Sequence, residues 1–161
     1  PPCHRWANRH AGRDEYADLL TPARSRLEAT GRPWIIENVP GAPLRADFRI
    51  TGDMVGLPLI KRARWFETNW YDSIAMVARV PVDGPVITVT GHGTTSGNRE
   101  TWGRNIRVAE MRAAMGIDWM NRDELSQAIP PAYSEYIGTQ LLRALADRAT
   151  KGNAPAGTPG R

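Results

Sequence analysis

The chain has 161 residues, 41% of them hydrophobic and 24% charged, a composition typical of one globular unit with a sizeable core. No apolar run approaches the roughly 18 residues of a membrane span, and the first residues form no apolar signal region, so we expect an intracellular protein. The single cysteine, Cys3, excludes an internal disulfide framework, and with His4 and His10 it makes only a weak case for zinc. We therefore expect no metal site.

A net charge of +4 and a sequence pI of about 9.7 fit an anionic partner, although modest basicity also serves solubility alone. The basic residues are nearly all arginines, since lysine occurs only at Lys61 and Lys151. Arginine bridges phosphates and guanine readily, but a coding genome rich in G and C would produce the same bias.

From Asp14 to Thr30, apolar side chains recur at helical spacing before Gly31, which predicts an amphipathic helix. The apolar run 34–36 that follows predicts a buried strand that stops in a loop over 37–41. A helix, a tight turn and a buried strand form an α/β unit.

Further strands are predicted at 48–51, 64–70 and 86–90, the last because it is rich in β-branched residues. The glycine-rich polar stretch from Gly91 to Gly103 has no periodicity and is predicted to be a mobile loop.

Three helices are expected in the last third of the chain. The first covers about 106–115 and ends at Gly116, and the second covers 121–127 behind a capping asparagine. Two prolines open the third, which we expect over about 130–148. The tail at 151–161 has nothing to bury and is expected to be disordered.

Four short motifs occur in one order: Pro2-Cys3, Glu37-Asn38-Val39, Arg62-Ala63-Arg64 and Gln127-Ala128-Ile129-Pro130-Pro131. Their order and spacing resemble the signature motifs of the DNA cytosine-5 methyltransferases. The resemblance covers about 1–142 and looks closest to the short phage and actinobacterial members, through the phrases at 34–44, 64–69 and 115–120. It implies an α/β fold, the Rossmann-like fold of S-adenosylmethionine-dependent methyltransferases, incomplete here at its N-terminus.

In this family a cysteine thiolate adds to carbon 6 of cytosine, which makes carbon 5 nucleophilic toward the methyl group of S-adenosylmethionine. The resemblance gives that role to Cys3. A thiol with a pKa of about 8.5 is only a few per cent ionised at neutral pH, so nearby arginines or backbone N–H groups would favour the thiolate. Without the resemblance, a lone cysteine is more often a small buried hydrophobe.

The resemblance also supplies roles for the acid and the arginines. Glu37, at the end of a predicted strand, would hydrogen-bond or protonate N3 of the base. Arg64 would bind the exocyclic O2, and Arg62 would steady the cysteine loop or a phosphate. On one strand both arginines would share a face. Without the resemblance, Glu37 is a solvated loop acid and the arginines belong to a solvent-facing edge strand.

The resemblance places Pro2, Gln127 and Ala128 beside S-adenosylmethionine. Gln127 stands where the family generally has Asn, and it could equally be an ordinary helix end. The sequence departs from the family pattern at three other positions. Ile60 and His4 stand where Gln is usual, and Ser126 stands where Gly is usual.

The family reads DNA between its arginine motif and its last motifs. That region contains Arg99, Trp102, Arg104 and Arg107, which we expect to contact double-stranded DNA and to offset the cost of flipping out a base.

These inferences divide the chain into a catalytic part at 1–85, a short target-recognition-like segment at 86–107, closing helices at 108–148 and a tail at 149–161. The chain starts at Pro1 without an initiator methionine, and the family's cofactor loop and ribose-binding acid precede the cysteine motif. We therefore expect a missing N-terminal half of the same protein as partner, and no activity from these residues alone. We expect a monomer in the cytoplasm of a bacterium or phage-infected host.

Two other functions remain open. An amino-methyltransferase would carry an aromatic residue after Pro-Pro, where Cys3 stands. A catalytically silent DNA-binding protein descended from a methyltransferase would use mainly its basic glycine-rich segment. The DNA target and the biological role, in restriction-modification, protection of a phage genome or regulation, are open as well.

Overall fold

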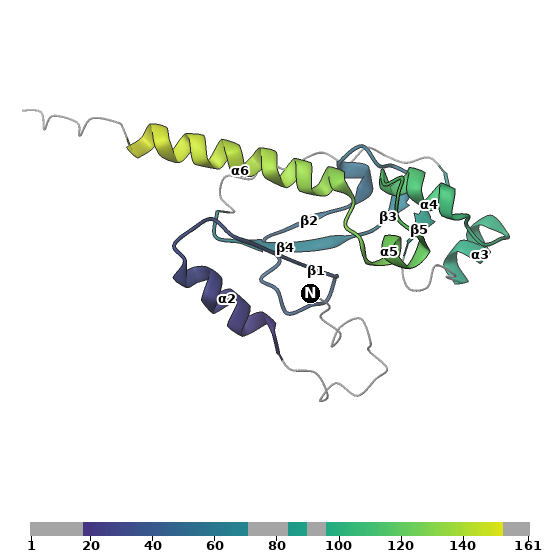
Figure 1. The fold of residues 1–161 in the computed structure, drawn as a ribbon, viewed down its shortest axis with the longest axis horizontal. Coiled ribbons are helices and arrows are strands. Elements are labelled where there is room, and N and C mark those ends of the chain that lie inside the picture. Colours follow the sequence, from purple (N-terminus) through teal and green to yellow (C-terminus); the bar gives the residue numbers. More distant parts are fainter. Residues whose placement is uncertain (1–17, 71–83, 90–95, 153–161) are drawn as a thin grey trace, which may run out of the picture.

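The computed structural model describes residues 18–70, 84–89 and 96–152 (Figure 1). These ranges contain both helices and short strands, which confirms the mixed α/β class. In chain order the elements are α2 (Leu20–Ala29), β1 (Ile35–Asn38), β2 (Phe48–Ile50), the 3-10 turn η2 (Gly52–Met54), β3 (Ile60–Lys61), β4 (Arg64–Thr68), β5 (Ile87–Thr88), α3 (Ser96–Trp102), α4 (Val108–Met115), α5 (Arg122–Gln127) and α6 (Pro131–Gly152).

Three strands form the central sheet in the order β1-β4-β2. Because β4 is antiparallel to both neighbours, β1 and β2 run in the same direction. Glu37 of β1 lies opposite Phe66 of β4, and Ile50 of β2 lies opposite Arg64. The carboxyl ends of β1 and β2 and the amino end of β4 therefore meet at one edge of the sheet.

An aromatic pair marks the face of this sheet that α6 covers. The rings of Phe48 and Phe66 stack with centroids 5.0 Å apart. Ile50 of β2 and Tyr133, in the first turn of α6, complete the buried cluster. Side chains alternate along a strand, so Glu67 points to the other face, where α2 reaches it through Arg24. The two helices lie on opposite sides of the strands (Figure 1).

A second cluster is built on the parallel pair β3-β5 with α3, α4 and α5. Its centre consists of Ile60, Val89, Met115 and Leu125, all buried. These elements gather at one end of the molecule, and α6 leaves from there along the central sheet (Figure 1). The chain returns from the second cluster to the central sheet at residues 62–63 and again at 128–130.

The predicted loop over Gly91–Gly103 is wrong for its second half, because residues 96–102 form α3. Buried Asn98 explains this helix, since its amide donates to Thr88 O at 2.8 Å and accepts from Thr88 N at 2.9 Å. The indole N–H of Trp102 also donates to Val86 O. Contacts with β5, not local propensity, determine the helix, and residues 90–95 lie outside the described ranges.

Several predicted boundaries also change. Described helix α2 begins at Leu20, where the Asp18 carboxylate accepts from the Leu20 backbone N–H at 2.9 Å. β1 continues through Asn38, because β4 pairs with it, so Glu37 lies in a strand and not in the predicted loop. The strand predicted at 86–90 covers only 87–88, and the one predicted at 64–70 ends at 68.

The C-terminal helices confirm the capping signals. Gly116 ends α4 in the left-handed conformation at φ 66°, and the Asn121 side chain accepts from the backbone N–H groups of Asp123 and Glu124 at the start of α5. Helix α6 continues to Gly152, beyond the predicted end, and the tail predicted to be disordered lies outside the described residues from 153 onward. No described helix is both long and apolar enough to cross a bilayer.

One glycine is required by packing where the two clusters meet. A Cβ added to Gly52 would stand 2.8 Å from Ile60 O and would also collide with Leu57 O and the Ile60 side chain. We predict that Gly52→Ala lowers the free energy of unfolding by about 3 kcal/mol or more, because backbone atoms surround the site. Urea denaturation followed by tryptophan fluorescence measures this.

Gly138→Ala is the matched control for this variant. Gly138 lies in α6 with open space around it. Alanine there should stabilise the helix by about 0.5–1 kcal/mol. A Gly52→Ala protein as stable as the wild type would contradict the packing around η2.

Candidate active site

A partly buried ion pair lies at the edge of the central sheet where β1 and β2 end. Arg64 Nε lies 2.7 Å from Glu37 Oε1, and its NH1 also donates to Ala63 O at 2.9 Å. The Glu37 side chain is 32% exposed and that of Arg64 10%. The register places Glu37 opposite Phe66, and Arg64 precedes Phe66 by two residues on the same face. Antiparallel pairing therefore joins two residues that are distant in sequence.

Arg62 does not share a strand face with Arg64, which corrects that expectation. It lies between β3 and β4, and only 2% of it is exposed. Its guanidinium donates from NH2 to Ser126 O at 2.8 Å and from NH1 to Val89 O. The alternative of a solvent-facing strand of charged residues is also wrong, since both arginines are buried.

Tyr133 is a member of this site that sequence reasoning missed. It is fully buried in the first turn of α6, and its hydroxyl donates to Arg62 O at 2.7 Å. The available signal was its position two residues after the proline pair that opens the helix. Tyr133 thus packs against the central sheet and fixes the backbone two residues before Arg64.

Burial is the largest influence on the pKa values of the four side chains of this site, which are Glu37, Arg62, Arg64 and Tyr133. Burial raises the pKa of Glu37 above its ordinary value, and the charges of Arg64 and Arg62 offset part of that rise. Burial and the nearby Arg64 lower the pKa of Arg62 to about 10, and burial raises that of Tyr133 to about 12. A carboxyl group with a raised pKa can donate a proton to a ring nitrogen. A fixed guanidinium beside it can donate hydrogen bonds to an adjacent carbonyl oxygen.

We predict that replacing Arg64 raises the pKa of Glu37 further. Arg64→Gln removes the nearest positive charge and leaves the burial that already disfavours the carboxylate. A carboxyl-detected NMR titration of Glu37 measures its midpoint in both proteins. Arg49→Gln, at an exposed position on β2, is the control and should leave the midpoint unchanged. A midpoint that falls in Arg64→Gln would contradict the ion pair.

The opposite face of the sheet holds a charged cluster that the sequence did not reveal. Glu67 is fully buried and accepts from Arg24 Nε at 2.5 Å, Arg24 NH2 at 2.8 Å and Arg45 N at 3.0 Å. Arg45 also pairs with Asp47 at 2.5 Å, and Ala46 between them has φ 54°. This cluster holds α2 and the segment before β2 against β4.

We predict that Glu67 contributes to acid sensitivity. The hydrogen bond from Arg24 holds the pKa of Glu67 below its ordinary value of 4.5. A depressed folded-state pKa stabilises the protein above the ordinary value, and this stability is lost as pH falls toward the folded-state pKa. Glu67→Gln should therefore lower the free energy of unfolding by about 2 kcal/mol at pH 7, and by less near pH 3.

Denaturant melts at several pH values test this prediction. Exposed Glu135 on α6 supplies the control, since Glu135→Gln should change stability little at either pH. An effect of Glu67→Gln that is the same at pH 3 and pH 7 would contradict the role assigned to the Arg24 contact.

The residues predicted near a cofactor are placed only in part. Gln127 is exposed as the last residue of α5, and half-buried Ala128 follows and packs against the second cluster. Pro2 and Cys3 lie outside the described residues. Among described residues, no group of three or more His, Cys, Asp and Glu side chains could hold a metal ion.

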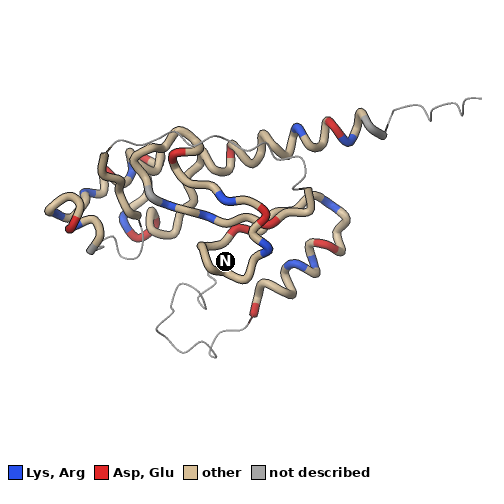
Figure 2. The backbone as a smooth tube through the Cα atoms, turned by 180° about the vertical axis from the view of Figure 1, so that it is seen from behind, with Lys and Arg blue, Asp and Glu red and all other residues tan. Residues whose placement is uncertain are grey.

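The four residues predicted to contact DNA differ in exposure. Exposed Arg99 donates to Asn105 Oδ1 at 2.9 Å, and half-buried Trp102 packs against the second cluster. Arg104 binds Glu110 through two hydrogen bonds of 2.9 and 2.6 Å, which helps to lower the pKa of Glu110 to about 2. Arg107 is 79% exposed. Basic and acidic positions are interspersed along the described chain (Figure 2).

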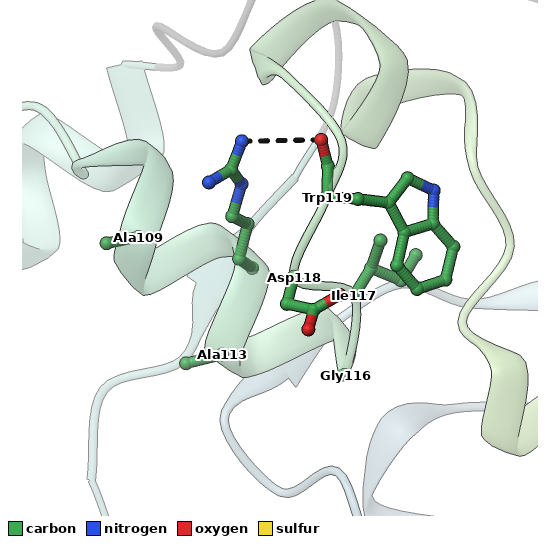
Figure 3. Close-up of a pocket in the computed structure, with 7 residues that line it drawn as sticks. Ala109, Ala113, Gly116, Ile117, Asp118 and Trp119 are labelled. Atoms are coloured by element: carbon green, nitrogen blue, oxygen red, sulfur yellow. Dashed lines mark hydrogen bonds between the residues drawn. The ribbon is translucent and has the colours of Figure 1, made fainter.

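A surface hollow lies elsewhere, between the end of α4 and the segment that follows it (Figure 3). Ala109 and Ala113 line it on the helix, and Trp119, 68% exposed, lines the other side. Arg112 donates to Met120 O at 2.7 Å and so fixes this segment. Neither Glu37 nor Arg64 lines the hollow, which is distinct from the ion-pair site.

No protein-family model, curated protein or solved structure matches the chain.

Proposed function

We propose that this chain is part of a DNA methyltransferase that transfers a methyl group from S-adenosylmethionine to carbon 5 of cytosine. The observation that carries the proposal is the Glu37–Arg64 ion pair at the carboxyl ends of β1 and β2. Ligands of open α/β sheets bind outside the carboxyl ends of strands, which is where a flipped base would meet both side chains. The Rossmann-like fold is part of the proposal.

In this reaction the Cys3 thiolate forms a bond from its sulfur to carbon 6 of the base. Electron density moves toward N3, which takes a proton from the Glu37 carboxyl group, while Arg64 donates hydrogen bonds to O2. After methylation a base removes the proton from carbon 5, the sulfur–carbon bond breaks, and the N3 proton returns to Glu37. Burial raises the pKa of Glu37, which favours the protonated form that this step needs.

S-adenosylmethionine, when bound, would supply an electrophilic methyl group to carbon 5, and the broken sulfur–methyl bond would leave its electron pair on a neutral thioether. Among described residues the exposed Gln127 amide, next to apolar Ala128, fits one edge of the adenosine, and the remainder of a cofactor site would come from other segments. We therefore predict that these 161 residues alone bind the cofactor weakly. Calorimetry that finds micromolar affinity would contradict this prediction.

The proposed substrate is double-stranded DNA. Flipping the base out of the stack costs a few kcal/mol, which contacts to the backbone must offset. Exposed Arg107 and Arg99 are the candidates. Arg104 binds Glu110 more closely than Arg107 does, at 2.6 Å against 3.4 Å, and Trp102 packs inward. Membrane contact is not part of the proposal.

A covalent adduct tests the proposed reaction. The protein at its full natural length is incubated with S-adenosylmethionine and duplex DNA that contains 5-fluorocytosine, in which fluorine replaces the proton that must leave. We predict an adduct stable to denaturing electrophoresis. Cys3→Ser should abolish it, and Glu37→Gln should slow its formation by about 10²–10⁴-fold because N3 loses its proton donor.

Glu67→Gln is the matched control for Glu37→Gln, since it alters a carboxylate on the other face of the sheet. It should reduce stability without a comparable loss of adduct formation. Methylation without an adduct would favour the amino-methyltransferase, and salt-sensitive DNA binding with neither product would favour the silent DNA-binding protein.

A further inference from the structure

Arg62 joins three segments of the chain that the proposed reaction needs in one arrangement. Its guanidinium donates to Val89 O after β5 and to Ser126 O in the last turn of α5. Its own carbonyl accepts from the Tyr133 hydroxyl in the first turn of α6 at 2.7 Å. Arg62 therefore sits where the central sheet, the second cluster and α6 meet.

We propose that Arg62 is a positioning residue that couples the Glu37–Arg64 pair to the end of α5, and that it does not contact the substrate. This inference rests on the proposed function, because it assigns the Glu37–Arg64 pair to the base and the end of α5 to the cofactor. Arg64 is two residues from Arg62 along the backbone, and Gln127 directly follows Ser126. The Arg62 side chain thus sets the distance between the backbone near Arg64 and the backbone near Gln127.

Burial explains why Arg62 is unavailable to a phosphate. Only 2% of the residue is exposed, each terminal nitrogen donates to one backbone carbonyl, and Nε is buried without a hydrogen-bond partner. The planar guanidinium holds its donors in a fixed fork, so it fixes the direction as well as the distance of each acceptor. A substrate phosphate would have to enter this buried site to reach the remaining N–H groups.

The energetics indicate a role in geometry. Arg62 carries a buried charge close to that of Arg64, an arrangement that burial and repulsion both disfavour. Apolar residues of similar volume often replace buried charges without loss of stability. A long apolar side chain could fill this space, but it could not hold Val89 O and Ser126 O in register.

The connection at residues 128–130 shows how the coupling spreads. Ala128 packs against the second cluster, whereas Ile129 packs against the cluster of Phe48 and Phe66 on the central sheet. Pro130 is buried next to them and leads into α6. A shift of the last turn of α5 would therefore reach the central sheet unless Arg62 opposes it.

The experiment compares Arg62→Met with Arg49→Met in the protein at its full natural length. Arg49 is exposed on β2, so its variant controls for loss of an arginine from this part of the sheet. Hydrogen exchange detected by mass spectrometry should rise at 87–89 and 125–129 in Arg62→Met only. Peptides from the β1–β4 ladder should keep their protection.

The chemical readout is adduct formation with 5-fluorocytosine DNA, with the KM for S-adenosylmethionine measured alongside. Arg62→Met should slow the adduct at least about tenfold, since small displacements of reacting groups have large effects on rate. It should also raise the KM for the cofactor, which Glu37→Gln should not. Arg62→Lys, which keeps the charge and can reach one carbonyl, should recover part of the rate.

Unchanged exchange at 87–89 and 125–129, or an adduct rate within about twofold of the wild type, would overturn the coupling. A merely structural role would reduce the amount of folded protein and leave the KM for the cofactor unchanged. If Arg62→Met does not fold, Tyr133→Phe removes only the hydroxyl bond to Arg62 O and should shift both readouts in the same direction by less. A wild-type protein that forms no adduct would overturn the proposed function, while the exchange data would still decide the coupling.

Discussion

The register of β4 is the constraint on which the rest of the described structure depends. β4 lies antiparallel between two strands that run in the same direction, and its central residues Trp65 and Phe66 face a defined partner on both sides. This register brings Arg64 to Glu37 and stacks Phe66 on Phe48. A slip by one residue would exchange the two faces and place Glu67 in the aromatic cluster. The stacked rings and the Glu67 ion pairs both exclude that alternative.

The same sheet pushes the pKa values of two carboxyl groups in opposite directions. Glu67 is more deeply buried than Glu37, yet its pKa is lowered, because Arg24 binds both of its oxygens. Glu37 has a single contact with Arg64. Burial raises its pKa by more than the charge of Arg64 lowers it, so its pKa is raised overall. Strong pairing suits a structural role and partial pairing suits proton transfer. Exposure alone would therefore not predict which of the two pKa values is raised.

Local signals predicted the structure where local interactions determine it. Gly116 and Asn121 mark their helix ends because each acts within one turn. Helix α3 was missed because its stability comes from the bonds between Asn98 and Thr88. The shared face of Arg62 and Arg64 was wrong because β3 ends before Arg62 and pairs with a different strand. Such features arise from pairings between distant segments, which residue periodicity does not encode.

The arginine-rich composition has a different meaning once the hydrogen-bond partners of the arginines are known. An excess of arginine first indicates an anionic ligand, but much of it here holds the protein itself together. Arg24 binds a buried carboxylate, and Arg62 binds two backbone carbonyls. Both use the planar fork that also recognises phosphate, so composition cannot separate internal from external use. Net charge therefore overstates the surface available to DNA. Any electrostatic attraction must come from exposed side chains such as Arg107.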